Sequence, residues 1–452
     1  MKKMCLVFLI SLLCLYPAVN LYADDAADIA KLEEKANQGN VDAQLDLGSK
    51  YYHGQGVEQS FDKAFEWLEK AAVQGDASAQ YNLGVMYLKG RGVKQDSYKA
   101  FEWFEKAAEQ GDSNAQFNLG VMYDQGQGVE QDYAKAFEWY EKSARQGDAA
   151  AQYNLAFMYY YGQAVKQDFH KAFEWYEKSA KQGDPDAQYK LGVMYEEGQG
   201  VKQDFHKAFG WYEKAAEQGN AAAQFNLGFM YRKGQGVDQD FHKAFEWFEK
   251  SAEQRNAAAQ YSLGVMYDKG QGVRQDYAKA FEWFEKAAEQ GNVAAQYNLG
   301  VMYEEGQGVK QDLHKAFEWY EKAAIQGDVD AQYNLGFMYD EGQGVTQDFS
   351  KAVLWYEKAA NQGHANAQNN LAIMYAEGQG VNQDFRKAVE WFEKAANQGN
   401  ADAQNNLGII YEEGRGGVKQ DYALAKEFFG KACDNGKQAG CDSYKELNMK
   451  GY

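Results

Sequence analysis

The sequence predicts an all-α protein, an α/α superhelical solenoid built from tandem 36-residue helix–turn–helix repeats. Two observations carry this prediction: the dipeptide Ala-Gln recurs at a constant interval of 36 residues, and all ten Trp keep one phase of the same interval. The dipeptide begins at residues 43, 79, 115, 151, 187, 223, 259, 295, 331, 367 and 403. Chance does not keep such a register, and a period of this length is typical of repeat architectures. The presence of only 2 Pro suits a chain that is mostly helical.

Residues 76–111 show what each position of a repeat does. Asp76 is a good N-cap for a first helix, and Gly90 is a residue of the kind that ends one. The apolar residues of this helix share one face: Ala79, Leu83, Met86 and Tyr87. Asp96 caps a second helix, which Gly111 closes. The second helix has a wide apolar surface, made of Ala100, Phe101, Trp103, Phe104, Ala107 and Ala108. We interpret the Trp column as part of the core.

A small residue recurs inside the first helix of every repeat. In the example it is Gly84, which costs about 1 kcal/mol relative to Ala in a helix interior. The same phase is occupied by Gly48, Gly120, Ala156, Gly192, Gly228, Gly264, Gly300, Gly336, Ala372 and Gly408. A repeated cost implies a repeated compensation, so we expect the second helix of a neighbouring hairpin to pack against this bare backbone. Stacking of hairpins would then bury the wide face of each second helix.

The two ends of the chain differ from the repeats. Residues 1–23 are predicted to be a signal peptide, with Lys2 and Lys3 before the apolar run 4–16. Residues 24–40 are predicted as an N-terminal capping half-repeat, 41–436 as eleven repeats, and 437–452 as a C-terminal capping helix and tail. Export makes the protein periplasmic or secreted. Because no other segment is apolar enough to span a bilayer, we expect no stable membrane insertion after signal cleavage.

Charge and cysteine content narrow the possible partners. The net charge is −19, which disfavours nucleic-acid partners, since these require a basic surface. After signal cleavage the remaining cysteines are Cys433 and Cys441, a closely spaced pair that in an oxidising compartment is typical of a disulfide. No metal site and no cofactor are predicted. His170, His206 and His242 share one phase, but stacked hairpins lie too far apart for adjacent repeats to share one ion easily, so they are interpreted as solvated.

The repeat motif A-x-A-Q-Y-N-L-G-x-M-Y-x-x-G-x-G-V-x-Q-D-F-x-K-A-F-E-W-Y-E-K-A-A-x-Q-G resembles the Sel1-like repeat family, over about residues 29–447. The Leu83-Gly84-x-x-Tyr87 pattern is also similar to the first helix of tetratricopeptide repeats. The resemblance implies an α/α superhelix that serves as an adaptor or scaffold. It also implies that bacterial members are often exported and linked to envelope complexes or host contact.

The end of the last repeat, from Lys431 to Cys441, resembles the cysteine-rich Helicobacter branch of the family. That branch, in which a disulfide joins the helices of each repeat, has been associated with penicillin binding. A penicillin-recognising enzyme needs a Ser with a Lys one helical turn away, and Ser60 and Lys63 have that spacing. The Ser-Asp-Asn and Lys-Thr-Gly elements are absent from the sequence, and most other repeats carry Asp at this phase. Ser60 is therefore interpreted as an N-cap.

The candidate binding residues are the two positions that follow Ala-Gln. They are predicted to line one continuous concave surface, with aromatic rings for contact area and Asn amides to pair with a peptide backbone. The candidates are Tyr81, Asn82, Phe117, Asn118, Tyr153, Asn154, Tyr297, Asn298, Tyr333 and Asn334. Two alternatives remain open: the Asn side chains bond an adjacent loop, or recent duplication has copied them passively.

The sequence thus favours an exported protein–protein interaction scaffold that binds a protein or peptide partner along this surface. One alternative function is a penicillin-binding or β-lactamase-like enzyme by family analogy, which is a weak basis for assigning function. A second alternative is a passive envelope spacer. The sequence leaves the partner and the oligomeric state open.

Overall fold

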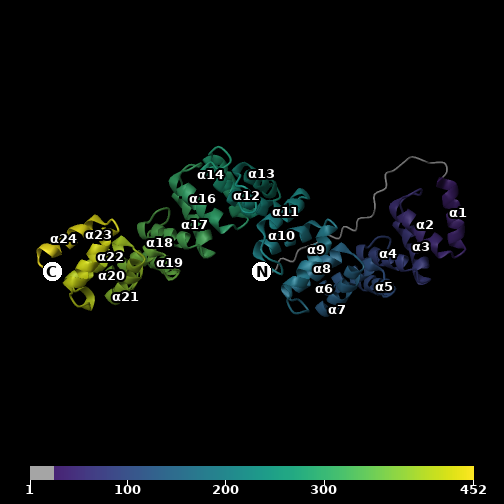
Figure 1. Ribbon diagram of the computed structural model, residues 1–452, viewed down its shortest axis with the longest axis horizontal. Helices are drawn as coiled ribbons and strands as arrows, with labels where there is room; N and C mark the ends of the chain where they lie inside the picture. Colours follow the sequence, from purple (N-terminus) through teal and green to yellow (C-terminus); the bar gives the residue numbers. More distant parts are fainter. Residues whose placement is uncertain (1–24) are drawn as a thin grey trace. The chain divides into compact units, whose positions relative to one another are not determined.

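The computed structural model describes residues 25–452, so the predicted signal peptide lies outside the described residues. This part of the chain forms 24 α-helices and one short 3₁₀ turn, with no strand among the described residues. Within residues 25–204, and likewise within residues 205–452, each helix lies beside the next one along the chain (Figure 1), as expected for hairpins joined by short turns. The fold is therefore an all-α solenoid of helix hairpins, which confirms the predicted fold class.

The chain divides into two compact units, one ending at Asp204 and the other beginning at Phe205. The helices of the first unit are α1 (Asp25–Asn37), α2 (Val41–His53), α3 (Phe61–Val73), α4 (Ala77–Lys89), α5 (Ser97–Glu109), α6 (Ser113–Gln125), α7 (Tyr133–Arg145), α8 (Ala149–Tyr161), α9 (Phe169–Lys181) and α10 (Pro185–Glu197). Those of the second unit are α11 (Phe205–Glu217), α12 (Ala221–Lys233), α13 (Phe241–Glu253), α14 (Ala257–Lys269), α15 (Tyr277–Glu289), α16 (Val293–Glu305), α17 (Leu313–Ile325), α18 (Val329–Glu341), α19 (Phe349–Asn361), α20 (Ala365–Glu377), α21 (Phe385–Asn397), α22 (Ala401–Glu413), the 3₁₀ turn η1 (Arg415–Gly417), α23 (Tyr422–Asp434) and α24 (Gln438–Met449).

The predicted caps set the ends of the helices. Asp76 accepts a hydrogen bond from the Ala79 backbone N–H at 2.7 Å, and Asp96 accepts one from the Lys99 backbone N–H at 3.0 Å. Gly90 follows α4 in the left-handed conformation, with φ of 64°. Each cap satisfies backbone groups that have no partner inside the helix, which is why helices α4 and α5 both end after 13 residues.

The core of each hairpin lies between its two helices. In the hairpin of α4 and α5, the side chains of Leu83, Met86 and Phe104 are completely buried. The prediction that the Trp column belongs to the core is wrong in part, because nine of the ten Trp are only half-buried and Trp355 alone is buried. In all ten, the ammonium group of the Lys three residues later lies 3.6–4.3 Å from the ring centroid. The rings therefore lie at the rim of the core, with a cation over one face.

The small residue of the first helix meets a different helix from the one predicted. A Cβ added at Gly84 would lie 2.7 Å from Cδ1 of Phe104, which belongs to the second helix of the same hairpin. Gly120 meets Tyr140 and Gly264 meets Phe284 in the same way. The expectation of a contact with a neighbouring hairpin is therefore wrong. The bare backbone instead leaves room for the largest buried ring of its own hairpin.

The second Gly of each interhelical turn makes the close contact between hairpins. Gly92 has φ of 68°, and a Cβ there would lie 2.5 Å from the carbonyl carbon of Phe61, at the start of α3 in the preceding hairpin. Gly272 has the same relation to Phe241. These turns therefore rest directly on the backbone of the preceding repeat, a position that favours a residue without Cβ.

The Gln of the Ala-Gln dipeptide fastens each hairpin to its predecessor. Gln80 in α4 donates to the carbonyl of Ala72 in α3 at 3.1 Å and accepts from the Gln110 side chain after α5 at 2.7 Å. The same two bonds recur at Gln44, Gln116, Gln152, Gln224, Gln260, Gln296, Gln332 and Gln368. Because these amides are buried, losing one partner would leave a buried polar group unsatisfied.

No helix in residues 25–452 is both long and apolar enough to cross a bilayer.

Candidate functional site

The aromatic half of the predicted site lies on the first helices of the hairpins. Tyr81, Phe117 and Tyr153 are on α4, α6 and α8 of the first unit, and Tyr297 and Tyr333 are on α16 and α18 of the second. Each ring packs against the large buried ring of its own hairpin, with centroids 5.4–6.0 Å apart. Tyr153 is buried, whereas the other four remain half-buried and keep part of each ring at the surface.

The Asn half of the site differs from repeat to repeat. Asn118 is buried, donates to the carbonyl of Asn114 at 2.8 Å, and lies near the hydroxyl of Tyr81 in the preceding repeat, where it partly offsets the rise in the pKa of Tyr81. Asn334 has the same effect on the pKa of Tyr297 and of Tyr320. These amides therefore lie beside tyrosine side chains of the preceding repeat rather than beside an adjacent loop.

The surroundings of the Asn side chains differ from repeat to repeat. Asn154 lies near the hydroxyl of Tyr140, a residue of the preceding repeat, and partly offsets the rise in the pKa of Tyr140. At the equivalent place before Asn82 and Asn298 the buried side chains are Leu68 and Phe284, which have no hydroxyl. Asn82 and Asn298 make no side-chain hydrogen bond among the described residues, and we call these two amides open.

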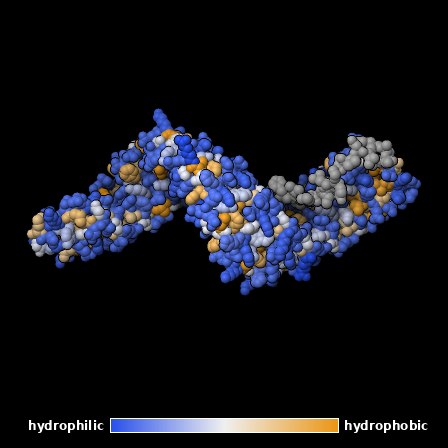
Figure 2. All heavy atoms as spheres, turned by 45° about the horizontal axis from the view of Figure 1, so that its top comes forward, coloured by the Kyte–Doolittle hydropathy of each residue, from blue (hydrophilic) through white to orange (hydrophobic). Residues whose placement is uncertain are grey.

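Carboxylates surround the tyrosines of this surface. Burial raises the pKa of Tyr320, and the hydrogen bond from its hydroxyl to Glu304 at 2.5 Å raises that pKa further. Burial and nearby Asp124 raise the pKa of Tyr140. Both hydroxyls therefore remain protonated donors at neutral pH. The face of the molecule drawn in Figure 2 is mainly hydrophilic, with small, separate hydrophobic areas.

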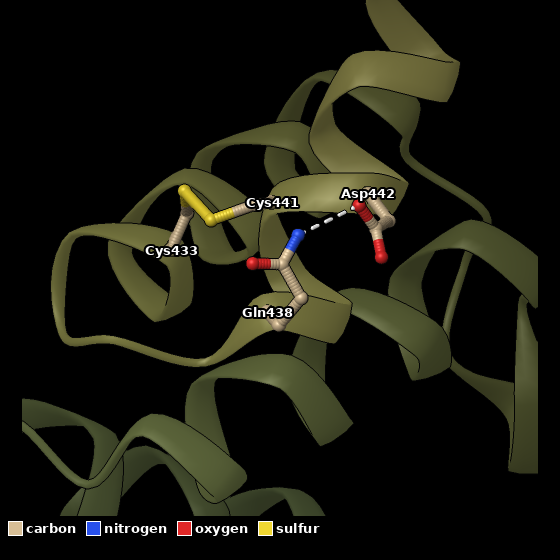
Figure 3. Close-up of a disulfide and its surroundings, with 4 residues drawn as sticks. All are labelled: Cys433, Gln438, Cys441 and Asp442. Atoms are coloured by element: carbon tan, nitrogen blue, oxygen red, sulfur yellow. Dashed lines mark hydrogen bonds between the residues drawn. A yellow bond between two sulfur atoms is a disulfide. The ribbon is translucent and has the colours of Figure 1, made fainter.

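The C-terminal cysteines come from adjacent helices. Cys433 lies near the end of α23 and Cys441 in the first turn of α24, as the sequence predicts. Their Cα atoms are 4.5 Å apart, within the range that a disulfide requires. Figure 3 shows their sulfur atoms joined, next to a hydrogen bond of 2.9 Å between Gln438 and Asp442 in α24.

The remaining candidate motifs have structural roles. Ser60 precedes α3 and accepts a hydrogen bond from the Lys63 backbone N–H at 3.4 Å, so it caps the helix as predicted. His170, His206 and His242 are exposed, and His170 lies 3.6 Å from Glu174. Between residues 25 and 452, no group of His, Cys, Asp or Glu side chains is arranged to hold a metal ion.

The hydrogen bonds of the buried Gln were not predicted. The Gln of the Ala-Gln dipeptide lies at a core position of the first helix, and a buried amide without partners is costly, so the sequence already contained a signal of a buried hydrogen bond.

The fold and the surface define a class of protein: a solenoid of helix hairpins whose first helices present a row of aromatic and amide side chains. Eleven consecutive segments match the Sel1 repeat: residues 41–76, 77–112, 113–148, 149–184, 185–220, 221–256, 257–292, 293–328, 329–364, 365–400 and 401–437. The chain belongs to the Sel1 repeat family.

Three solved structures are similar to the chain. A protective antigen of uropathogenic Escherichia coli with the SLR fold is 39% identical over 93% of this chain and 90% of its own, with a TM-score of 0.83. A Sel1 repeat protein from Oxalobacter formigenes is 38% identical over 68% of this chain and 90% of its own, with a TM-score of 0.55. Helicobacter pylori cysteine rich protein B is 31% identical over 28% of this chain and 92% of its own, with a TM-score of 0.24.

Proposed function

We propose that this protein is an exported scaffold that binds a partner polypeptide along the first helices of its hairpins. The observation that carries the proposal is that the first helices of each unit carry half-buried rings with an open amide beside them. These residues are Tyr81, Phe117 and Asn82 in the first unit, and Tyr297, Tyr333 and Asn298 in the second. Rigid rings give contact area at a small cost in conformational entropy, and an open amide can pair with a peptide group. The carboxylates near the tyrosines favour a partner with polar or basic groups along this row.

The test compares variants of the two open amides with variants of amides that lie near a tyrosine hydroxyl. Asn82→Ala and Asn298→Ala, made singly and together, should weaken capture of the partner from envelope or host extracts and leave the melting midpoint unchanged. Each lost hydrogen bond contributes about 0.5–1.5 kcal/mol, so the double variant should bind about tenfold more weakly. Capture is quantified by mass spectrometry and thermal unfolding by circular dichroism.

The matched control is the pair Asn154→Ala and Asn334→Ala, whose amides lie near the hydroxyls of the buried Tyr140 and Tyr320. These changes remove a polar neighbour of a buried hydroxyl, so they should lower the melting midpoint. If the open pair lowers the midpoint and capture per folded molecule stays the same, the binding proposal is wrong. A passive envelope spacer would show no specific capture by any variant.

Export and the cysteine bond form one further part of the proposal. The mature chain would begin near Asp24 and carry Cys433 and Cys441 as a disulfide formed in an oxidising compartment. Intact mass and thiol titration of the protein recovered from periplasm or medium should show loss of the first 23 residues and no free thiol. Two free thiols in the native protein would refute the bond, and an intact N-terminus would refute cleavage.

We further propose that the protein acts without catalysis. The role of Ser60 as a helix cap supports this for the one serine that has the spacing of a penicillin-recognising enzyme. Labelling with a fluorescent penicillin and turnover of nitrocefin test the enzymatic alternative directly, and a covalent adduct at Ser60 would overturn this inference.

A further inference from the structure

One repeat departs from the others around its buried tyrosine. The buried Tyr140, Tyr320 and Tyr356 each lie near a carboxylate of their own hairpin and an Asn of the next repeat. For Tyr356 these neighbours are Asp340, at 3.2 Å, and Asn370, also at 3.2 Å. At the equivalent places around Tyr176 the sequence has Tyr160 instead of the carboxylate and Lys190 instead of the Asn.

These two replacements leave the Tyr176 hydroxyl without its usual partners. Its side chain is completely buried, and its oxygen has no hydrogen-bond partner among the residues described. The ring lies 5.4 Å from Tyr153 and 6.4 Å from Tyr160, measured between centroids. Burial raises the pKa of Tyr176 well above its usual value, so the hydroxyl stays protonated and can donate. A buried donor without a partner is unfavourable, and a ligand that accepted its hydrogen bond would remove this cost.

Lys190 lies beside the same ring cluster. Its ammonium group is 5.7 Å from the ring centroid of Tyr160 and 5.9 Å from that of Tyr161. In residues 25–452 no carboxylate lies within ion-pair distance of it. Tyr161 is 53% exposed, whereas Tyr160 is held by a hydrogen bond of 2.5 Å to Gln199 in the turn after α10. An unpaired cation therefore lies next to a fixed ring and an exposed ring, on a chain with a net charge of −19.

We propose that Lys190, with Tyr160, Tyr161 and the Tyr176 hydroxyl, binds an acidic side chain of the partner polypeptide. This inference rests on the proposed function and adds to it. Lys190 supplies the charge, the rings of Tyr160 and Tyr161 contact the residues beside the acidic one, and displacement of the exposed Tyr161 ring brings the carboxylate to the Tyr176 hydroxyl. Equivalent places in other repeats carry Asp124, Glu304 or Asp340 and an Asn in place of Lys190. Here Glu197 and Asp184 lie near Tyr160 and Tyr176, and Lys190 supplies the positive charge that the equivalent places lack. The site would thus fix the register of the partner.

The variants that test this site replace each residue by the one that other repeats carry, so each is compatible with the fold. Lys190→Asn and Tyr160→Asp restore the usual partners of Tyr176, and Tyr176→Phe removes its hydroxyl, as in Phe104. All three should keep or raise the melting midpoint. Lys166→Asn, at an exposed Lys in the turn before α9, is the control for loss of charge alone.

The probe is a pool of C-terminally amidated nonapeptides with a fixed central Asp and randomised flanks, compared with the same pool carrying Asn. The full mature chain should bind the Asp pool about tenfold more tightly in fluorescence anisotropy, as expected for a charge-assisted hydrogen bond. Lys190→Asn should abolish this preference, Tyr176→Phe should reduce it, and Lys166→Asn should retain it. An Asn pool with a free C-terminal carboxylate shows whether a chain terminus serves equally well.

Equal binding of the Asp and Asn pools by the wild type, or an unchanged preference in Lys190→Asn, would overturn the acidic-residue site. Either result would leave the wider proposal standing if a partner is still captured in the Asn82 and Asn298 experiment. If no partner is captured and the Asp pool is still preferred, the wider proposal fails and the acidic-residue site remains.

Discussion

Gly264→Leu should destabilise the second unit by about 3 kcal/mol or more. A Cβ at Gly264 would lie 2.5 Å from Cδ1 and 2.6 Å from Cε1 of Phe284, whose ring is buried at the centre of the same hairpin. The rest of a Leu side chain would have to enter the same space, so α14 and α15 would be forced apart in a close-packed core. Denaturant unfolding followed by circular dichroism measures this change in the free energy of unfolding.

Gly210→Ala is the matched control in the same unit. Gly210 lies inside α11, and a Cβ there would meet nothing within 4 Å. Ala should therefore stabilise this helix by about 0.5–1 kcal/mol, because it removes the entropic cost of a helical Gly without a clash. If Gly264→Leu were as harmless as Gly210→Ala, the contact between the small residue and the buried ring would not be what selects Gly.

Gly272→Ala should destabilise the protein by about 2–4 kcal/mol. Gly272 has φ of 69°, which costs an L-residue about 1–2 kcal/mol, and its added Cβ would lie against the carbonyl group of Phe241. Because the obstacle is backbone at the start of α13, no side-chain rotation can relieve the clash, and overpacking adds about 1–3 kcal/mol. The measurement is the midpoint of chemical unfolding at constant slope.

One repeat allows the opposite substitution to be tested. Ala164 occupies the phase of Gly272 in an earlier repeat and has φ of 61°. Ala164→Gly should therefore stabilise the first unit, by about 1 kcal/mol or more. Arg255→Gly, at another positive φ of 65°, relieves only the backbone strain, since the equivalent Gly219 and Gly291 have open space around them. A loss of stability in Ala164→Gly would contradict the account of this turn.

Much of the fold can be predicted from the sequence because each weak signal of a helix end recurs in every repeat. Any single Asp-x-x or Gly is a weak signal of a helix end, but Asp76, Gly90 and Asp96 have counterparts every 36 residues, so the caps could be predicted individually. The core face of the first helix followed from the spacing of Ala79 and Leu83 in the same way. The position of the Cys pair at the last helix junction was also predictable.

What the sequence could not show was which hairpin a given side chain meets. Gly84 contacts its own second helix rather than a neighbouring one, because periodicity defines faces but not the partner of a face. The predicted burial of the Trp residues was too high. Their spacing shows that they lie on the apolar face of the second helix, but it does not show whether a residue lies at the rim of the core or at its centre. The neighbours of each Asn side chain depend on whether the preceding repeat has a Tyr 14 or 37 residues earlier in the chain. That relation becomes visible only once the stacking of the hairpins is known.

The buried Gln bonds have a consequence for how the gene can change. Each hairpin is joined to its predecessor by the same bond, from its buried Gln to a carbonyl of the preceding second helix, and a second Gln of its own hairpin holds that amide in place, whatever residues occupy the surface. Recombination between two near-identical repeats, which removes or adds 36 residues, therefore joins two ends that fit each other as well as the original ones did. The length of the protein is free to drift. The surface is not, because each such event places one Asn behind a new predecessor, and the amide gains or loses a hydroxyl neighbour where the old and new predecessors differ between Tyr and Phe.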